Sequence, residues 1–170
     1  MPRTTPKKQL TLAGPPRLVS EAGLSRVAKD LAKKVLEKPS AKPATVIALS
    51  GELGVGKTTF TKVFLKALGV RESVTSPTFI LFRPYPLPPI NQLTNQPTNF
   101  DLAYHIDCYR LENPKELLKL GLKEMLQNPR HLVVIEWAER VKKFLPKKAI
   151  WLKLEHGARK NTRKVAIRGF

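Results

Sequence analysis

Cysteine, acidic residues and long apolar runs are all scarce in this sequence. The lone cysteine, Cys108, excludes an internal disulfide framework and any metal site built from several cysteines. Apolar runs extend over only a few residues, which is too short to cross a membrane, and residues 1–8 precede no apolar segment of signal-peptide length. We therefore expect a cytoplasmic protein without membrane contact.

Positive charge exceeds negative charge, with 31 basic and 13 acidic residues and a net charge of +18. Residues 1–43 carry ten of the basic and three of the acidic residues, and residues 141–170 carry ten and one. The excess therefore lies at the two ends of the chain. It fits a partner rich in phosphate or carboxylate, and it fits equally a lysine-rich surface that favours solubility.

The length of 170 residues suggests one domain that buries about 70% of the surface of its unfolded chain. Residues 1–17 contain four prolines and several charges, so we expect a basic tail there and a single domain over residues 18–170. Ser20 is suited to cap a helix, because apolar residues recur at helical spacing from Leu24 to Leu36.

The central motif is Gly51-Glu52-Leu53-Gly54-Val55-Gly56-Lys57-Thr58, which has the spacing of a phosphate-binding loop. Its glycines allow backbone turns that point successive N–H groups at an anion. Lys57 supplies a cation for terminal phosphates, and Thr58 supplies a hydroxyl for magnesium, which prefers oxygen ligands.

The context of this loop supports the motif. Residues 45–49 predict a buried strand before it, and residues 60–68 predict a helix after it that ends at Gly69. A strand, a glycine-rich loop and a helix together aim the helix N-terminus at phosphate. We therefore predict that the chain binds a nucleoside triphosphate.

Two further segments follow the loop helix. Ser76-Pro77-Thr78 holds the chain extended and presents two hydroxyls, and we expect an apolar strand directly behind it, through Leu81. The segment is either an ordinary turn or a switch that senses the terminal phosphate. Residues 83–100 are rich in Pro, Asn and Gln without periodicity, which predicts a surface loop inserted into the domain.

Acidic residues mark two predicted strands. Residues 104–109 alternate so that His105, Asp107 and Tyr109 share one face. Asp107 is expected to meet magnesium, or else Arg110 or backbone amides. Residues 132–135 predict a buried strand that ends at Glu136. Strand ends in open α/β sheets face the ligand crevice, so Glu136 is a candidate to bind magnesium or to activate water.

The remaining segments predict a helix, a hairpin and a wall for the pocket. Residues 114–125 predict one amphipathic helix with four leucines toward the core: Leu117, Leu118, Leu120 and Leu122.

Trp137 is either a core aromatic or a wall of the nucleotide pocket. Residues 150–154 and 164–167 predict a hairpin. Near its turn lie three basic residues that contact nucleotide or tRNA, or else are solvated: Arg159, Lys160 and Arg163.

Four motifs, in this order, resemble the TsaE (earlier YjeE) family, small bacterial ATPases needed for threonylcarbamoyladenosine on tRNA. They are the loop from Gly51 to Thr59, Ser76-Pro77-Thr78-Phe79, His105-Ile106-Asp107-Cys108-Tyr109-Arg110-Leu111, and Ile135-Glu136-Trp137. The resemblance covers about residues 18–168. The stretch between Phe79 and His105 is longer than the family pattern.

The resemblance implies an α/β P-loop NTPase fold with a central, mainly parallel sheet flanked by helices. It implies a slow, Mg²⁺-dependent ATPase that acts with TsaB-like and TsaD-like proteins, of which TsaD attaches the threonylcarbamoyl group beside the anticodon. Catalytic roles fall on Lys57, Thr78, Asp107 and Glu136, and Mg²⁺ binding falls on Thr58, Asp107 and Glu136. We expect ATP to contact Glu21, Gly51, Glu52, Leu53, Gly54, Val55, Gly56, Lys57, Thr58, Thr59, Trp137, Arg159 and Lys160.

Other functions share the phosphate loop. A small-molecule kinase needs a pocket for a second substrate and an arginine-bearing lid, for which Arg83 in the expected insertion is the one hint. A GTPase is disfavoured, because the sequence has no Asn-Lys-x-Asp and no Asp-x-x-Gly element. A nucleotide-gated binding module with incidental hydrolysis is the third alternative. Lys57, Thr58, Asp107 and Glu136 together favour the ATPase.

Overall fold

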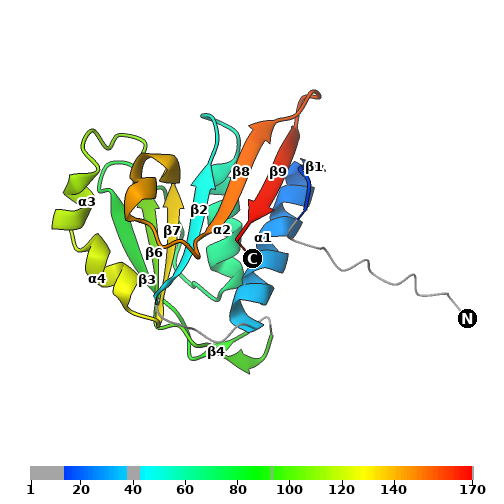
Figure 1. Cartoon of the computed structure of the whole chain (residues 1–170). Coiled ribbons are helices and arrows are strands. Elements are labelled where there is room, and N and C mark those ends of the chain that lie inside the picture. The colour runs from blue at the N-terminus through cyan, green and yellow to red at the C-terminus, as the bar shows by residue number, and fades with distance from the viewer. Residues whose placement is uncertain (1–13, 38–42, 93, 170) are drawn as a thin grey trace, which may run out of the picture.

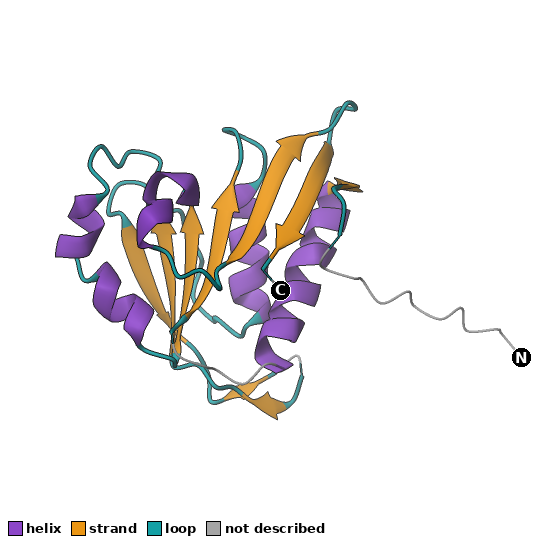
Figure 2. Ribbon diagram, in the orientation of Figure 1, coloured by secondary structure: helices purple, strands orange, loops and turns teal. Residues whose placement is uncertain are grey.

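The structure is a computed structural model that describes residues 14–37, 43–92 and 94–169. The elements are, in chain order, β1 (Arg17–Ser20), α1 (Glu21–Glu37), β2 (Thr45–Ser50), α2 (Lys57–Ala67), β3 (Phe82–Pro86), β4 (Ile90–Asn91), β5 (Gln96–Pro97), β6 (Leu102–Asp107), α3 (Lys115–Lys119), α4 (Leu122–Gln127), β7 (His131–Glu136), the 3₁₀ helix η1 (Ala138–Phe144), β8 (Ile150–His156) and β9 (Thr162–Arg168). Helices cover both faces of a central sheet (Figures 1 and 2). None of the helices in these ranges is long and apolar enough to span a membrane.

The central sheet has seven strands in the order β1-β9-β8-β2-β7-β6-β3. Its middle is parallel, because β2 pairs in parallel with both β7 and β8, and β6 pairs in parallel with β7. The outer pairings, β3 with β6, β8 with β9 and β1 with β9, are antiparallel. The mainly parallel sheet and the C-terminal hairpin are thus confirmed. The carboxyl ends of β2, β6 and β7 meet at one edge of the sheet, where ligands bind in open α/β folds.

Strand β2 shows why the predicted strands are apolar throughout. Ile47 and Leu49 belong to the core cluster that includes α1 and α2, and Val46 and Ala48 belong to the cluster under α3, α4 and η1. A parallel strand covered on both faces cannot alternate between apolar and polar side chains. The continuous apolar runs before the phosphate loop and before Glu136 follow from this arrangement.

Both helices expected around the phosphate loop are confirmed. Ser20 caps α1, with its Oγ accepting a hydrogen bond of 3.1 Å from the backbone N of Gly23. Helix α2 ends before Gly69, whose φ of +102° lies in the left-handed region that favours glycine. The two helices pack side by side on one face of the sheet (Figure 1).

The N-terminal tail was expected over residues 1–17. Residues 1–13 lie outside the described part of the chain, so the structure does not address them. Arg17, however, begins β1 and pairs with Val165 of β9, which makes it part of the sheet rather than of a tail. Because β1 is only four residues long, its alternation is too short to predict a strand from sequence.

The apolar strand expected through Leu81 is wrong in position. Phe79 and Ile80 lie in a turn and are 82% and 61% exposed, and the strand begins one residue beyond Leu81, at Phe82. Leu81 has a φ of +64°, which is uncommon for a residue other than glycine. The chain turns at this residue, directly before β3 begins. The apolar residues Phe79 and Ile80 therefore belong to an exposed turn and not to a buried strand.

The loop expected over residues 83–100 is also wrong for part of its length. Residues 82–86 form β3, which pairs with β6 at the edge of the main sheet, and two short strands form a separate ladder. Tyr85 is fully buried, and its hydroxyl accepts a 3.3 Å hydrogen bond from the backbone N of Thr75. Edge strands tolerate the prolines that made this segment resemble a loop.

The single helix expected over residues 114–125 is two helices, α3 and α4. Gly121, with a φ of +90°, separates them in a conformation that stops a helix. Leu117 and Leu122 are buried as expected, but Leu118 and Leu120 are 37% and 44% exposed. The break changes the direction of the chain, so the helical spacing does not continue across it.

The burial of Tyr85 gives a test of the corrected segment. We expect Tyr85→Ala to lower the free energy of unfolding by about 3–5 kcal/mol, because it leaves a cavity beneath the sheet. Ile90→Ala, at a position 55% exposed, is the matched control and should change it by about 0.5 kcal/mol or less. Denaturant unfolding measures both, and equal small effects would contradict the placement of β3 in the core.

Candidate active site

The phosphate loop joins β2 to α2 at the carboxyl edge of the sheet. Gly51, Gly54 and Gly56 have φ values of +141°, +74° and +107°, as the turns of such a loop require. At Gly51 the requirement is also steric, since a Cβ would lie 2.2 Å from the backbone oxygen of Leu154 in β8. The loop is therefore packed against the C-terminal hairpin as well as wrapped around its own hollow.

A hollow of about 240 Å³ lies over this loop. Its lining comes from the loop and the start of α2, from the turn after α2, and from the ends of β6 and β7: Leu53, Gly54, Gly56, Lys57, Thr58, Thr59, Ser76, Thr78, Asp107, Tyr109, Glu136 and Trp137. The structure thus brings together the predicted residues of four separate motifs. Val55 points away from it, with its side chain buried in the core among α1 and α2.

Lys57 is folded back onto the loop. Its Nζ donates hydrogen bonds to the backbone oxygens of Gly51 at 2.6 Å and Glu52 at 2.8 Å, and it lies 3.8 Å from the centre of the Trp137 ring. Burial removes the ammonium from water and lowers the pKa of Lys57 below its ordinary value, while nearby carboxylates, first Glu136, offset part of this effect. An anion bound in the hollow would favour the charged form.

Thr58, Glu136 and His105 form a continuous hydrogen-bonded chain. Thr58 Oγ1 donates to Glu136 Oε2 at 2.7 Å, and the other carboxylate oxygen, Oε1, lies 2.7 Å from His105 Nε2. Glu136 is 1% exposed and His105 is fully buried. A buried carboxylate requires such partners. Sequence analysis placed His105 on the correct face but missed its contact with Glu136, because that contact depends on the register between β6 and β7.

Asp107 is bound to the segment after α2. Its Oδ2 accepts hydrogen bonds from Thr78 Oγ1 at 2.5 Å and Ser76 Oγ at 3.1 Å, and its Oδ1 accepts one of 2.9 Å from the backbone N of Tyr109. Arg110, the alternative partner expected from the sequence, instead places its guanidinium 4.4 Å from the centre of the Phe79 ring. Ser76 and Thr78 therefore meet Asp107 at the rim of the hollow.

Trp137 forms part of the wall. It is half-buried, its φ of +57° is unusual for a tryptophan, and its ring centre lies 5.1 Å from that of Tyr109. A non-glycine residue held in this region costs about 1–3 kcal/mol and persists only where surrounding contacts impose it. Both expected alternatives, a core aromatic and a wall of the pocket, are therefore met in part. The Trp137 side chain packs against the core cluster under α3, α4 and η1, and it also lines the hollow.

Six predicted nucleotide contacts lie outside the lining: Gly51, Glu52 and Val55 of the loop itself, and Glu21, Arg159 and Lys160 beyond it. Glu21 is exposed at the start of α1, and Arg159 and Lys160 are exposed at the turn between β8 and β9. The hairpin reaches the loop through a different residue, Arg163, whose Nε donates to the backbone oxygen of Val55 at 2.8 Å. Neighbouring basic residues in a turn give no sequence signal that tells which of them faces the loop.

The donor atoms at the hollow are those that magnesium prefers. Thr58 offers a hydroxyl, and Asp107 and Glu136 offer carboxylates. Among the residues that the structure describes, no group of three or more His, Cys, Asp and Glu is arranged to hold a metal ion. Mg²⁺ is commonly bound by one or two carboxylates together with substrate phosphates rather than by an all-protein cage.

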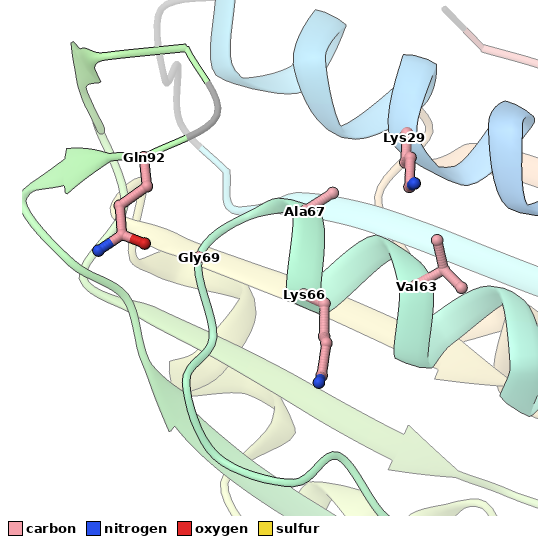
Figure 3. A pocket seen from close by; sticks show the side chains of 6 residues that line it. All are labelled: Lys29, Val63, Lys66, Ala67, Gly69 and Gln92. Carbon is pink, nitrogen blue, oxygen red and sulfur yellow. The ribbon is translucent and has the colours of Figure 1, made fainter.

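A second and larger hollow, of about 500 Å³, lies between α1, α2 and the segment around β4 (Figure 3). It is lined by Lys29, Val63, Lys66, Ala67, Gly69 and Gln92. Among the described residues of this lining the titratable side chains are two lysines, and no carboxylate or hydroxyl accompanies them as a ligand for magnesium. The smaller hollow over the phosphate loop is therefore the candidate active site.

Cys108 does not take part in chemistry here. It is fully buried, and burial raises the pKa of its thiol to about 12. At about pH 8 we expect its thiolate fraction to be on the order of 1000-fold below that of an ordinary thiol. Iodoacetamide should therefore label Cys108 in guanidinium chloride but not in the native protein, as measured by mass spectrometry. Rapid native labelling would contradict the burial.

Comparison with known proteins identifies the family. Residues 18–165 match the family described as "Threonylcarbamoyl adenosine biosynthesis protein TsaE". The chain is 39% identical over 115 residues to a tRNA threonylcarbamoyladenosine biosynthesis protein TsaE from Rickettsia bellii, covering 67% of this chain and 71% of that one. It is 37% identical over 139 residues to the protein of the same name from Rickettsia conorii, covering 81% and 69%. A crystal structure of YdiB from Bacillus subtilis superposes with a TM-score of 0.55 and 26% identity, covering 90% of this chain and 86% of that one. The chain belongs to the TsaE family of tRNA threonylcarbamoyladenosine biosynthesis proteins.

Proposed function

We propose that this chain is the ATP-binding and ATP-hydrolysing component of the tRNA threonylcarbamoyladenosine machinery and that it acts with TsaB-like and TsaD-like proteins. The observation that carries the proposal is the 2.7 Å hydrogen bond between Thr58 and Glu136. It joins the last residue of the phosphate-loop motif to a buried acid at the end of β7. This pairing of a hydroxyl with a carboxylate is what a magnesium-nucleotide site requires.

The loop is the part that binds phosphate. Its backbone N–H groups and the N-terminus of α2 face the hollow, and they attract negative charge without any side chain. Lys57 adds a mobile cation, which exchanges its hydrogen bonds with the carbonyls of Gly51 and Glu52 for bonds to phosphate oxygens. Charge-assisted hydrogen bonds of this kind are roughly twice as strong as neutral ones, so the exchange favours the bound nucleotide.

The acidic side of the hollow is the part that serves hydrolysis. Thr58, Glu136 and Asp107 would hold Mg²⁺, which supplies positive charge beside the phosphates. Glu136 is placed to orient or deprotonate the attacking water. Thr78 reports on the terminal phosphate through its hydrogen bond to Asp107, since movement of the turn at residues 76–80 changes that contact.

The rival kinase has little support. Arg83, its candidate lid residue, lies in edge strand β3, where its guanidinium donates to Thr75 Oγ1 at 3.1 Å and lies 3.7 Å from a Glu72 carboxylate oxygen. Arg83 lies in a strand of the sheet and its guanidinium contacts Thr75 and Glu72, so it is not placed on a lid that closes over a second substrate. The binding module with incidental hydrolysis is the alternative that the experiments below separate from an ATPase.

Lys57→Ala tests phosphate binding. We expect it to weaken ADP and ATP binding by about 10- to 100-fold, because hydrogen bonds to a charged group contribute about 1.5–3 kcal/mol each. Lys66→Ala removes an exposed lysine from the other end of the same helix and serves as the matched control. Fluorescence titration with a labelled nucleotide measures both dissociation constants, and equal affinities would show that the loop does not bind phosphate through Lys57.

Glu136→Gln tests hydrolysis and partnership together. Phosphate release from ATP is measured for the protein alone and then with TsaB and TsaD from the same source. We expect weak activity alone and higher activity with the partners, and a loss of about 100-fold or more in Glu136→Gln with ATP binding retained. Glu139→Gln, three residues further along the chain in η1 and exposed, should behave as the unmodified protein.

The other outcomes assign the rival functions. If Glu136→Gln hydrolyses ATP as well as the unmodified protein, then Glu136 is not part of the mechanism. Partner binding that responds to ATP without any partner-dependent hydrolysis would instead identify the nucleotide-gated binding module. Strong hydrolysis that requires an added small molecule and ignores both partners would identify the kinase.

A further inference from the structure

We infer that His105 is a positioning residue, which fixes Glu136 through one carboxylate oxygen so that the other oxygen faces Thr58 and the phosphate loop. This inference rests on the proposed function of Glu136. His105 does not line the hollow, so it would not touch the nucleotide or the metal ion itself. It would act by deciding where the carboxylate lies before nucleotide and magnesium arrive.

The contacts of Glu136 divide its two oxygens between two partners. Oε2 accepts from Thr58 at 2.7 Å on the side of the loop, and Oε1 meets His105 Nε2 at 2.7 Å on the side of the core. Within the described ranges these are the hydrogen bonds that the carboxylate makes. Thr58 could bind a metal ion through a lone pair of Oγ1 while its O–H still donates to Oε2, and His105 holds the other oxygen from the core side, away from any ligand.

Sheet geometry makes this contact possible. Asp107 is the register partner of Glu136 in the pairing of β6 with β7, and His105 lies two residues earlier on the same face of β6. A diagonal neighbour on an adjacent strand lies within the reach of a long side chain. The imidazole of His105, which is fully buried in the core, therefore contacts the Glu136 carboxylate from the side opposite the phosphate loop.

The nitrogens of His105 separate it from a histidine of purely structural role. Since a carboxylate accepts, Nε2 donates to it, and the other ring nitrogen, Nδ1, is buried without a hydrogen-bond partner in the described structure. His131, at the start of β7, has both nitrogens engaged, Nε2 with Asn128 at 3.0 Å and Nδ1 with the backbone oxygen of Met125 at 3.1 Å. Leaving a buried acceptor unpaired is costly, and among the described residues the side chain of His105 has its hydrogen bond with Glu136.

An aliphatic side chain would fill the same space without an unpaired nitrogen. Burial alone therefore does not explain an imidazole at this position, whereas a donor aimed at Glu136 does. Partners of metal-binding carboxylates commonly change metal affinity or activity by about 10- to 100-fold when removed. We expect an effect of this size at His105.

The test compares two amide variants with each other and with the histidine that lacks this role. His105→Gln places an N–H donor near the position of Nε2, and His105→Asn has the same amide on a shorter side chain that cannot reach Oε1. His131→Gln is the matched control at the other end of β7. For each protein, nucleotide affinity is titrated without Mg²⁺ and with Mg²⁺, kcat for ATP is measured with the partners present, and Tm is recorded.

We expect His105→Asn to bind nucleotide normally without Mg²⁺, to lose most of the gain in affinity that Mg²⁺ gives, and to have kcat reduced about 10- to 100-fold. His105→Gln should recover most of both quantities at a similar Tm. His131→Gln should lower Tm and leave the Mg²⁺ effect and kcat unchanged.

Equal losses in His105→Gln and His105→Asn would overturn the inference, since they would show that only the packing of the imidazole matters. Unchanged Mg²⁺ response and kcat in His105→Asn would overturn it as well. An unmodified protein that binds no nucleotide would instead overturn the proposed function on which the inference rests, so the two failures are distinguished by the unmodified protein alone.

Discussion

The parallel pairing of β2 with β7 is the constraint on which the site depends. Leu49, at the end of β2, is the register partner of Glu136, so the acid is delivered beside the point where the chain leaves the sheet to form the phosphate loop. A slip of one residue would turn Glu136 to the opposite face, under η1, and would bury a carboxylate among apolar side chains. Burial of the apolar residues therefore favours the same register of β2 and β7 that places Glu136 beside the phosphate loop.

Two halves of the hollow have different mechanical character. The loop, Thr58 and Glu136 are held by the sheet and by α2, whose residues lie in the core. The turn that carries Thr78 is held by the hydroxyl contacts with Asp107, by the buried Pro77 and by a backbone hydrogen bond from Ile80 to Pro77, while its Phe79 and Ile80 are exposed. The proposed switch role falls on this turn, where the exposed side chains contribute fewer core contacts than the residues of the loop side do.

Sequence could predict the elements whose signals are local. The phosphate-loop spacing, the apolar strands before Gly51 and Glu136, and the cap at Ser20 each depend on neighbouring residues, and the structure confirms these elements. Strand β3 could not be predicted, because its prolines are typical of loops and its place at the edge of the sheet depends on pairing with a distant strand. The same is true of the contact between His105 and Glu136, which requires the register of β6 against β7.

The packing of Gly51 against the backbone of Leu154 has a consequence for how this position evolves and how its variants are understood. Glycine is required there by a neighbouring strand, whether or not phosphate is ever bound. A substitution at Gly51 would push β8 at Leu154 away from the phosphate loop, and with it the hairpin residue Arg163, which supports the loop at Val55. Gly51 is thus required both by the turn of the phosphate loop and by its packing against β8. A loss of nucleotide binding on its replacement would therefore not distinguish a lost phosphate contact from a displaced strand.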